Sequence, residues 1–427
     1  MSSWKQVRFS EICDITRGGS PRPIQEYMTN DGVPWIKISD ATASNSRFIE
    51  KTKEFIKTSG ISKSREVFPD DLILSNSATP GIPKFMRIYA CIHDGWLLLR
   101  NFNGAEKEFI YWLLLNERDK LIQQGNGSVF TNLKTDILKN HIVNIPDDIE
   151  EQKRIATILN NIQEKIELNT QINQTLEQIA QTIFKSWFID FDPVHDKANA
   201  LASGQTLEQA TQAAMAVISG KNTQELHRLQ TANPEQYQQL WEIAETFPSG
   251  FDEEGVPRGW EERYLKDVCN IVYGKGLPKN KLTEKGFYVF GANGVIGFYD
   301  SYTYEKPQVL IGCRGTVGQV TLSYPYSFVT NNSLVIEYEN SCVSMYYLEK
   351  YLSNINLKEI SSGSVQPQIT IQNMSKVKIL IPNIEILNFY SEKVKEIYDK
   401  RLHHFYENQS LSKVRDLLLP KLLSGEV

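Results

Sequence analysis

The chain carries one arrangement of motifs twice, and this internal repeat restricts its possible folds more than any other feature. Residues 4–21 (WKQVRFSEICDITRGGSP) and 260–278 (WEERYLKDVCNIVYGKGLP) share a Trp, a Cys and a Gly-rich turn in the same order. The match continues through an apolar run, the loop after it and a Gly-Ser-Val tripeptide: 72–74 and 310–311, 79–81 and 316–318, 127–129 and 363–365. The period is far too long for a solenoid, so we expect two large copies of one globular unit.

A long helix is predicted after each copy, because apolar residues recur there at spacings of three and four. The two stripes comprise Ile155, Ile158, Ile162, Ile172, Leu176, Ile179 and Ile183 in the first and Val394, Ile397, Leu411, Val414 and Leu418 in the second. Polar residues interrupt them at Lys165 and Asn169, and at Arg401 and His404. Neither helix buries its stripe alone, so antiparallel coiled-coil pairing within one chain is favoured over each helix capping its own domain.

The fold class expected from this pattern is α+β. Short apolar runs bounded by Gly, Pro, Asn or Ser indicate many short strands in each copy. At 427 residues with 41% hydrophobic content, the chain has room for two or three domains. The expected segments are a first globular unit, a first helical region, a helical insertion, a second globular unit and a second helical region: 1–145, 146–192, 193–256, 257–382 and 383–427. Within the insertion, the Ala- and Gln-rich residues 198–247 carry enough apolar side chains to favour a helical subdomain over a disordered linker.

The sequence gives no sign of membrane insertion or of a disulfide framework. Its apolar runs are short, and the N-terminal residues lack the apolar stretch of a signal peptide, so the cytoplasm is the expected compartment. The five cysteines are odd in number and never spaced as C-x-x-C, which indicates reduced thiols rather than disulfides or a zinc site. No metal or cofactor is expected.

The net charge of -5 is unevenly distributed. Residues 1–145 hold 19 basic and 16 acidic side chains, and residues 256–382 hold 13 and 10, so each copy carries +3. Residues 146–255 hold 7 and 18, which gives -11. A phosphate backbone is attracted to the copies and repelled by the connecting segment, although a difference of this size also fits ordinary solvated surfaces.

Polar, Gly-rich loops lie at matching places in the two copies, but their side chains differ. Glycines allow a backbone to approach a phosphate closely, although the same residues also fit plain turns. Arg can pair with guanine, and Asn or Gln with adenine, in the major groove. The candidate DNA-binding residues are Arg17, Ser20, Arg22, Ser75, Asn76, Ser77, Asn126 and Lys134 in the first copy and Lys275, Lys279, Asn293, Arg314, Thr316, Gln366 and Gln368 in the second.

Several motifs together resemble the DNA specificity subunit of type I restriction-modification enzymes. Residues 187–194 (WFIDFDPV) are similar to the end of the family's first helical region, and residues 419–425 (LPKLLSG) to its C-terminal end. Residues 257–260 (PRGW) resemble the start of the second recognition domain. The chain departs from the pattern after Pro382, where the Glu-Gln pair found at 151–152 has no counterpart. The resemblance covers essentially the whole chain.

This resemblance implies two target recognition domains separated by two long antiparallel coiled-coil helices. Each domain would read one half of a split site in double-stranded DNA, two methylation subunits would dock on the helical regions, and restriction (motor-nuclease) subunits would join them. The chain itself would be a non-catalytic subunit that recognises DNA and scaffolds the complex.

The alternative from a different class is a self-sufficient DNA methyltransferase or nuclease with an unrecognised catalytic site. The carboxylates of Asp147 and Glu151 near Lys153 superficially suit a nuclease, but acidic residues at a helix start are explained by the helix dipole. Residues 219–223 (SGKNT) lack the Ser or Thr that a phosphate-binding loop needs directly after Lys. A purely structural helical bundle is the third possibility.

Overall fold

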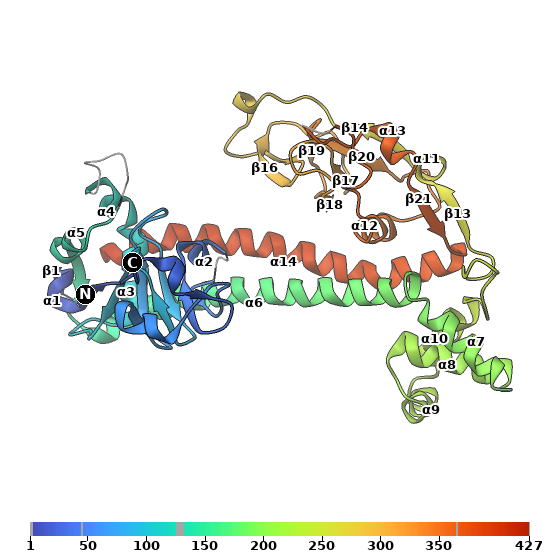
Figure 1. Ribbon diagram of the computed structural model, residues 1–427, viewed down its shortest axis with the longest axis horizontal. Coiled ribbons are helices and arrows are strands. Elements are labelled where there is room, and N and C mark those ends of the chain that lie inside the picture. Colours follow the sequence, from blue (N-terminus) through green and yellow to red (C-terminus); the bar gives the residue numbers. More distant parts are fainter. Residues whose placement is uncertain (1–2, 44–45, 125–131, 364–365, 427) are drawn as a thin grey trace. The chain divides into compact units, whose positions relative to one another are not determined.

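The computed structural model describes residues 3–43, 46–124, 132–363 and 366–426. The chain forms two compact units, unit 1 from Met1–Gln171 with His404–Val427 and unit 2 from Ile172–His403. Two long helices, α6 (Ile149–Phe188) and α14 (Ile384–Ser424), each contribute residues to both units (Figure 1).

Unit 1 contains two five-stranded sheets and a two-stranded ribbon. The ribbon pairs β1 (Trp4–Arg8) with β12 (Ile142–Pro146). The central sheet has the order β2 (Asp14–Arg17), β11 (Trp96–Arg100), β8 (Leu72–Ser75), β9 (Pro83–Met86), β5 (Phe48–Ile49). The other sheet has the order β3 (Met28–Thr29), β6 (Phe55–Ile56), β4 (Val33–Ile36), β10 (Ala90–Ile92), β7 (Arg65–Val67). The apolar runs of β8 and β11 are buried on both faces, which is why they read as continuous rather than alternating.

The helices of unit 1 cover the ends and one side of these sheets. They are α1 (Phe9–Ile12), α2 (Ile38–Thr42), α3 (Lys107–Asn116), α4 (Arg118–Gln124) and α5 (Thr135–Asn140), with 3₁₀ turns at Ile24–Glu26 and Thr58–Lys63. Gln152, near the start of α6, is fully buried: its side chain accepts from the Glu106 N–H at 2.7 Å and donates to the Pro146 carbonyl at 2.8 Å. The Gln of the Glu-Gln pair therefore fastens α6 to its own globular repeat.

Unit 2 repeats the same plan with smaller sheets. A ribbon pairs β13 (Glu261–Tyr264) with β21 (Lys378–Ile381). The central sheet has the order β14 (Asn270–Tyr273), β20 (Ser333–Glu337), β17 (Val309–Gly312), β18 (Val320–Leu322). The third sheet has the order β16 (Gly294–Tyr299), β15 (Phe287–Gly291), β19 (Phe328–Val329). The helices are α11 (Leu265–Val268), α12 (Met345–Ser353) and α13 (Ile371–Met374), with a 3₁₀ turn at Lys279–Lys281.

The two globular repeats share their topology, which confirms the predicted α+β class and the internal repeat. In each, a ribbon joins the first and last strands, a one-turn helix follows the first strand, and three central strands pair in the same order. The central trio is β2, β11, β8 in the first repeat and β14, β20, β17 in the second, and all the pairs are antiparallel.

In unit 1 the helices α6 and α14 run antiparallel and meet through polar side chains. Asn169 is completely buried, and its amide donates to Glu407 at 2.7 Å and to Asn408 at 2.8 Å. One turn and a half earlier, Gln163 accepts from the Arg415 guanidinium at 2.6 Å. The predicted polar interruption at Asn169 is thus a buried contact of the helix pair, of the kind that fixes register.

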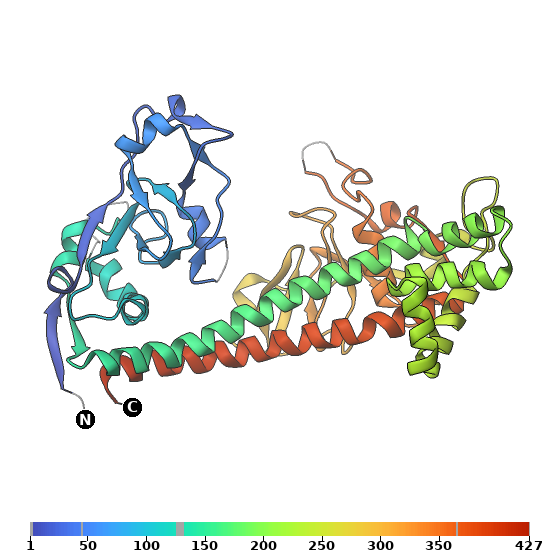
Figure 2. The ribbon, with the colours of Figure 1, turned by 90° about the horizontal axis from the view of Figure 1, so that it is seen from below.

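In unit 2 the same helices pair through a polar step and then an aromatic cluster. The Asn173 amide donates to the Arg401 carbonyl at 3.1 Å, which again shows the antiparallel direction. Nearer the end of α6, the Phe184 ring lies 6.0 Å from that of Tyr390 on α14 and 5.5 Å from that of Tyr347 on α12. Both views show the two helical segments side by side within this unit (Figure 2).

The predicted stripe on α6 is partly wrong. Ile179, assigned to the buried seam, is 43% exposed, whereas Ala180 and Phe184 beside it are buried. On α14, Val414 is 46% exposed. The buried seam is rotated relative to the predicted stripe, so that Gln163 lies in it while Ile179 stays outside.

The segment after α6 is helical, as the sequence predicts. It forms α7 (Asp192–Ala202), α8 (Leu207–Ser219), α9 (Thr223–Ala232) and α10 (Pro234–Thr246). Lys197 is buried and donates to the carbonyls of Ala244 and Phe247, at 3.2 and 2.6 Å, where α10 ends. The Trp187 ring of α6 packs edge-on against Phe247 at 5.2 Å, so the four helices share the core of unit 2.

Candidate nucleic-acid interface

Three loops meet at one end of the central sheet in each repeat. In the first repeat, one loop follows β2, one follows β8 and one precedes β11. The cross-strand pairs Leu97–Arg17 and Trp96–Ser75 place these three strand ends side by side. We call residues 18–22, 76–79 and 93–95 the first rim. The corresponding loops around β14, β17 and β20 are residues 274–278, 313–317 and 330–332, which we call the second rim.

Asp94 is the centre of the first rim. Its carboxylate accepts a hydrogen bond from Ser20 at 2.6 Å and lies 3.4 Å from a terminal nitrogen of Arg22. Arg17 donates from Nε to the Asp94 carbonyl at 2.8 Å and places a terminal nitrogen 3.8 Å from the carboxylate. The Asn76 amide donates to the same carbonyl at 3.2 Å. Four candidate residues from two separate loops therefore converge on one residue of the third loop.

The surroundings of Asp94 keep it ionised. Partial burial by itself raises the pKa of its carboxyl, but the Ser20 hydrogen bond and the neighbouring His93, Arg17 and Arg22 outweigh that effect and hold the pKa below its ordinary value. Burial lowers the pKa of His93, whose Nδ1 accepts the Gly95 N–H at 2.9 Å. The first rim thus presents two exposed guanidinium groups around one fixed negative charge.

Two glycines of the second rim permit close backbone packing. A Cβ on Gly274 would lie 2.3 Å from the Thr330 carbonyl oxygen, and a Cβ on Gly312 would lie 2.2 Å from that of Thr316 and 2.5 Å from that of Ala292. No other residue type fits at these points without moving a neighbouring loop. Gly312 thereby brings the loop that carries Asn293 against the one that carries Arg314 and Thr316.

Five main-chain hydrogen bonds of the first rim have counterparts in the second. They join equivalent positions in the two repeats, although many of the side chains at these positions differ. In the following pairs the first-rim bond stands before its second-rim counterpart, and each N–H donor stands before its carbonyl acceptor. The pairs are Gly18 to Trp96 (2.9 Å) with Gly274 to Ser333 (3.1 Å); Gly19 to Ile92 (3.2 Å) with Lys275 to Val329 (2.8 Å); Asn76 to Gly95 (2.8 Å) with Cys313 to Asn332 (2.9 Å); Gly81 to Ser75 (2.8 Å) with Gly318 to Gly312 (2.8 Å); and Leu133 to Asn76 (2.8 Å) with Ile369 to Cys313 (3.1 Å). This correspondence makes Asp94 equivalent to Asn331 and Ser77 equivalent to Arg314.

Comparison with known proteins assigns both repeats to one family. The family model described as the type I restriction modification DNA specificity domain matches residues 1–178 and 257–414, which together are most of the chain. The chain belongs to this family. The resemblance expected from the sequence motifs is thereby confirmed.

Individual members of the specificity family align over nearly the full length. The chain is 33% identical to the type I restriction enzyme HindI specificity subunit of Haemophilus influenzae, in an alignment covering 100% of both chains. It is 24% identical to the type I restriction enzyme MjaIX specificity subunit of Methanocaldococcus jannaschii, covering 99% of this chain and 93% of that one. The fold is shared with the crystal structure of a type I restriction-modification S subunit from M. genitalium, with a TM-score of 0.56, 16% identity, and coverage of 99% and 96%.

The candidate residues of the first repeat separate into exposed and buried groups. Arg17 and Arg22 have side chains 60% and 74% exposed, so they are open to DNA. Ser75 is a correction, because it is fully buried: its hydroxyl donates to the Thr79 carbonyl at 2.6 Å and accepts from the Ile82 N–H at 2.8 Å. As the last residue of a buried strand, Ser75 shapes the loop from inside.

The other candidates of the first repeat adjoin the same rim or fall outside the described residues. Asn76 is 5% exposed, and its amide holds the Asp94 loop, so we assign it to support of the rim rather than to contact with a base. Ser77 is half-buried in the rim, and Lys134 is exposed directly after Leu133, which bonds to Asn76. Asn126 lies outside the described residues.

All seven candidates of the second repeat are exposed: Lys275, Lys279, Asn293, Arg314, Thr316, Gln366 and Gln368. Gln368 joins the rim through its neighbour Ile369, whose N–H bonds to the Cys313 carbonyl. Lys279 begins the 3₁₀ turn just beyond the rim. In the part of the chain that the structure describes, Arg314 forms no ion pair, unlike Arg17 and Arg22 of the first rim.

The third loop of each rim was missed by reasoning from the sequence. It contains Asp94 in the first repeat and Asn331 and Asn332 in the second. The Asp94-Gly95 and Asn331-Asn332 pairs, each directly before a buried strand, are turn signals that could have pointed to them.

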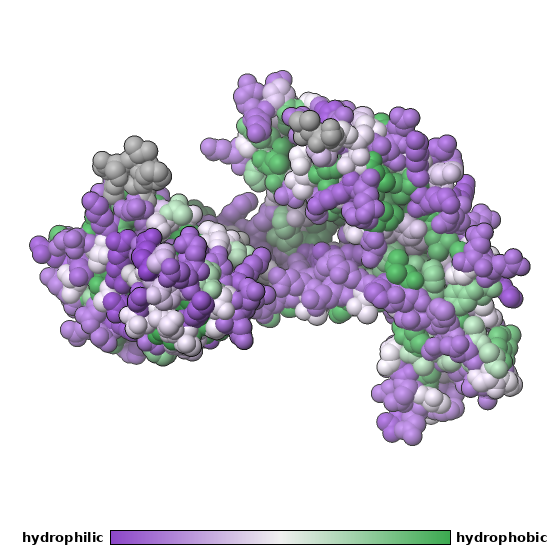
Figure 3. Space-filling view, viewed as in Figure 1, coloured by the Kyte–Doolittle hydropathy of each residue, from purple (hydrophilic) through white to green (hydrophobic). Residues whose placement is uncertain are grey.

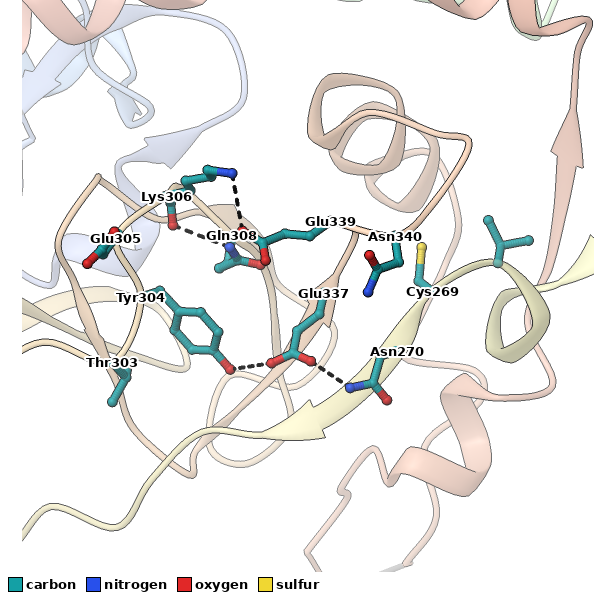
Figure 4. A pocket seen from close by; sticks show the side chains of 11 residues that line it. Cys269, Asn270, Thr303, Tyr304, Glu305, Lys306, Gln308, Glu337, Glu339 and Asn340 are labelled. Carbon is teal, nitrogen blue, oxygen red and sulfur yellow. Dashed lines mark hydrogen bonds and ion pairs between the residues drawn. The ribbon is translucent and has the colours of Figure 1, made fainter.

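A cavity of about 490 Å³ lies at the other end of the central sheet of the second repeat (Figure 4). Glu337 sits on its wall, where it accepts from the Tyr304 hydroxyl at 2.9 Å and from the Asn270 amide at 2.6 Å. Lys306 pairs with Glu339 at 3.5 Å across its mouth. Because Asn270 starts β14 and Glu337 ends β20, the cavity is separated from the second rim by the length of these strands.

The described segments contain no group of three or more His, Cys, Asp or Glu side chains placed to hold a metal ion. None of their helices combines the length and the apolar character that crossing a membrane requires.

Proposed function

We propose that the two rims of this type I specificity subunit read the two halves of a split site in double-stranded DNA. Specificity subunits are non-catalytic DNA-recognition subunits of restriction-modification systems, and this chain is one of them. The observation that carries the split-site proposal is the duplicated main-chain scaffold with different side chains. Two readers with one backbone and two sets of polar groups suit two different half-sites.

The recognition domains in this proposal are residues 1–145 and 257–382, and their exposed rim residues divide by chemistry. Arg17, Arg22 and Arg314 carry the planar donor fork that matches guanine O6 and N7, and Gln366 and Gln368 can pair with adenine. Lys134, Lys275 and Lys279 are point charges suited to phosphates. Asn293 and Thr316 lie on loops that Gly312 draws together, so they extend the reading surface.

The helical regions in this proposal, residues 146–192 and 383–427, fix the spacing between the half-sites. Helix α6 has 40 residues, which corresponds to about 60 Å of straight helix at a rise of about 1.5 Å per residue. The buried Asn169 contacts hold α6 in one register with α14 in unit 1. A fixed register gives a fixed number of unspecified base pairs.

The partners in this proposal are two methylation subunits docked on the helical regions, joined by restriction subunits in the full complex. Large apolar side chains are left exposed on the helices of unit 1, at Leu168, Val414 and Leu417, with exposures of 51%, 46% and 69%. In Figure 3 hydrophilic residues cover most of the visible surface of unit 1. A partner that covered these three side chains would remove their apolar surface from water, which favours association.

The test is genome-wide mapping of methylated adenines after co-expression of the full chain with a matching methylation subunit. We expect one motif with two short defined halves at a constant spacing. The Arg314→Ala variant should relax one position in a single half, with a loss of about 1–3 kcal/mol in discrimination. Lys306→Ala, at the other end of the same sheet, is the matched control and should leave the motif unchanged.

Two results would contradict the proposal. A continuous methylation motif would contradict the proposal that the two rims read separate half-sites. Uniformly weaker methylation at every sequence in Arg314→Ala would make Arg314 a phosphate contact and not a base reader. Methyl transfer by the purified chain without any partner would instead support the self-sufficient methyltransferase.

A further inference from the structure

The two rims differ in charge at one equivalent position of the third loop. The Asn76 N–H donates to the Gly95 carbonyl, and the Cys313 N–H donates to the Asn332 carbonyl in the same way. Gly95 and Asn332 are therefore equivalent, and so are the residues that precede them, Asp94 and Asn331. One rim therefore has a carboxylate where the other has a neutral amide. This difference lies in the third loop, beside the exposed cations of each rim.

The Asp94 loop forms hydrogen bonds with one nitrogen of Arg17 and one of Arg22 and leaves the other part of each guanidinium exposed. Arg17 is fixed through Nε to the main-chain carbonyl and Arg22 through a terminal nitrogen to the carboxylate. A guanidinium has five N–H donors in a rigid fork, so each arginine keeps donors available after these contacts. Both side chains remain more than half exposed, at 60% and 74%.

Asp94 is itself held in place. Ser20 donates to one carboxylate oxygen at 2.6 Å, while Asn76 and Arg17 anchor its carbonyl at 3.2 and 2.8 Å. Asp94 is therefore held through its carboxylate by one hydrogen bond and through its main-chain carbonyl by two. A residue held in this way orients the groups paired with it, and orientation before binding reduces the entropy lost on binding. In the second rim no such anchor for Arg314 is found among the described residues.

We infer that Asp94 is a specificity-determining positioning residue, which orients Arg17 and Arg22 for bidentate contact with guanine in the first half-site. The second rim, with Asn331 at this position, reads its half-site with an arginine that is not oriented in advance. The inference rests on the proposed function, because it concerns how one rim reads bases. It predicts stricter base selection in the first half-site than at the Arg314 contact of the second.

The test uses Asp94→Asn and the matched reverse change Asn331→Asp, each in the full chain co-expressed with the methylation subunit. Asp94→Asn keeps the size of the side chain and an acceptor for Ser20 but removes the charge. We expect base preference at one or two positions of one half to fall about tenfold, the order of discrimination that a bidentate pair gives. Total methylation at the cognate site should change less. The base preference in the half of the motif that Arg314→Ala affects should stay unchanged. Asn331→Asp should leave the first half unchanged.

The outcomes separate the two proposals. If the unaltered chain yields no split motif, the proposed function fails. If the split motif is present but Asp94→Asn keeps every base preference, or lowers methylation equally at all sites, the positioning role of Asp94 fails. Should Asp94→Asn not fold, the double variant Arg17→Gln/Arg22→Gln tests the same contact from the other side. This double variant must lower the base preference in the same half of the motif, and an unchanged motif overturns the inference.

Discussion

Replacing Gly274 by Ala tests the close packing that shapes the second rim. The added Cβ would lie 2.3 Å from the Thr330 oxygen, whereas real Cβ atoms stay at 3.0 Å or more, so the turn must move by at least 0.7 Å. Three hydrogen bonds cross this contact: Gly274 to Ser333 (3.1 Å), Lys275 to Val329 (2.8 Å) and Asn331 to Lys275 (3.1 Å). The shift stretches them to roughly 3.5–3.8 Å, beyond the usual range. At about 1 kcal/mol each, their loss destabilises the closed rim by about 3 kcal/mol.

Amide hydrogen exchange measures this directly, because it reports local opening. We expect exchange at Lys275 and Asn331 to be roughly 100-fold faster in Gly274→Ala, since about 1.4 kcal/mol corresponds to a factor of ten. Gly276→Ala is the control in the same turn: nothing lies within 4 Å of its added Cβ, and its φ is not in the left-handed region. Equal protection in the two variants would refute the argument from close packing.

Three other changes follow from the contacts of the two units. Asn169→Ala removes two hydrogen bonds to α14, one of them to a carboxylate, and should lower the free energy of unfolding by about 2–4 kcal/mol; an unchanged denaturation midpoint would contradict this. Phe184→Ala empties an aromatic cluster in unit 2 and should cost about 3–5 kcal/mol in thermal unfolding, whereas a loss below about 1 kcal/mol would mean that the core closes around the gap. The folded-state pKa of Asp94 lies below its ordinary value of 3.8, so its ionised form stabilises the fold above that pH and the contribution disappears as pH falls through the folded-state pKa. The stability difference between the unaltered chain and Asp94→Asn should therefore be constant above about pH 7, where the neighbouring His93 is neutral, and should shrink in strong acid, where Asp94 takes up a proton.

The repeat and the fold class were predictable because they depend on the order of motifs along the chain. Apolar runs such as 72–74 and 309–311 became buried central strands, and the loops after them became parts of the rims. Family membership was predictable for the same reason, since motifs at the ends of the helical regions keep their order.

The orientation of individual side chains was less predictable. Ser75 was placed on a loop, but it is the last residue of β8, a strand that is buried on both faces, so its side chain is buried as well. On α6, several apolar residues of the predicted stripe lie beside the true seam, and the face that turns inward depends on the polar and aromatic side chains packed against it. The sequence of α6 alone does not contain that information.

Asp94 was missed because its partners are remote along the chain. Arg17 is 77 residues away and Ser20 is 74 residues away. Only the pairing of β11 with β2 brings them together, and this pairing had not been assigned from the sequence. The candidate arginines were chosen by residue type, whereas the residue that contacts them depends on strand pairing.

The main-chain support of the rims has a consequence for how DNA preference can change. Because N–H and carbonyl groups hold these loops in both repeats, most exposed side chains on them contribute little to folding. If the rims read DNA as proposed, a substitution at Arg314 or Gln368 would therefore alter the base preference at small cost to stability. Glycines such as Gly274 and Gly312 have no such freedom. Variation in this protein should accumulate at the tips of the rims, so that new target sites arise through a few exposed changes on a backbone that stays the same.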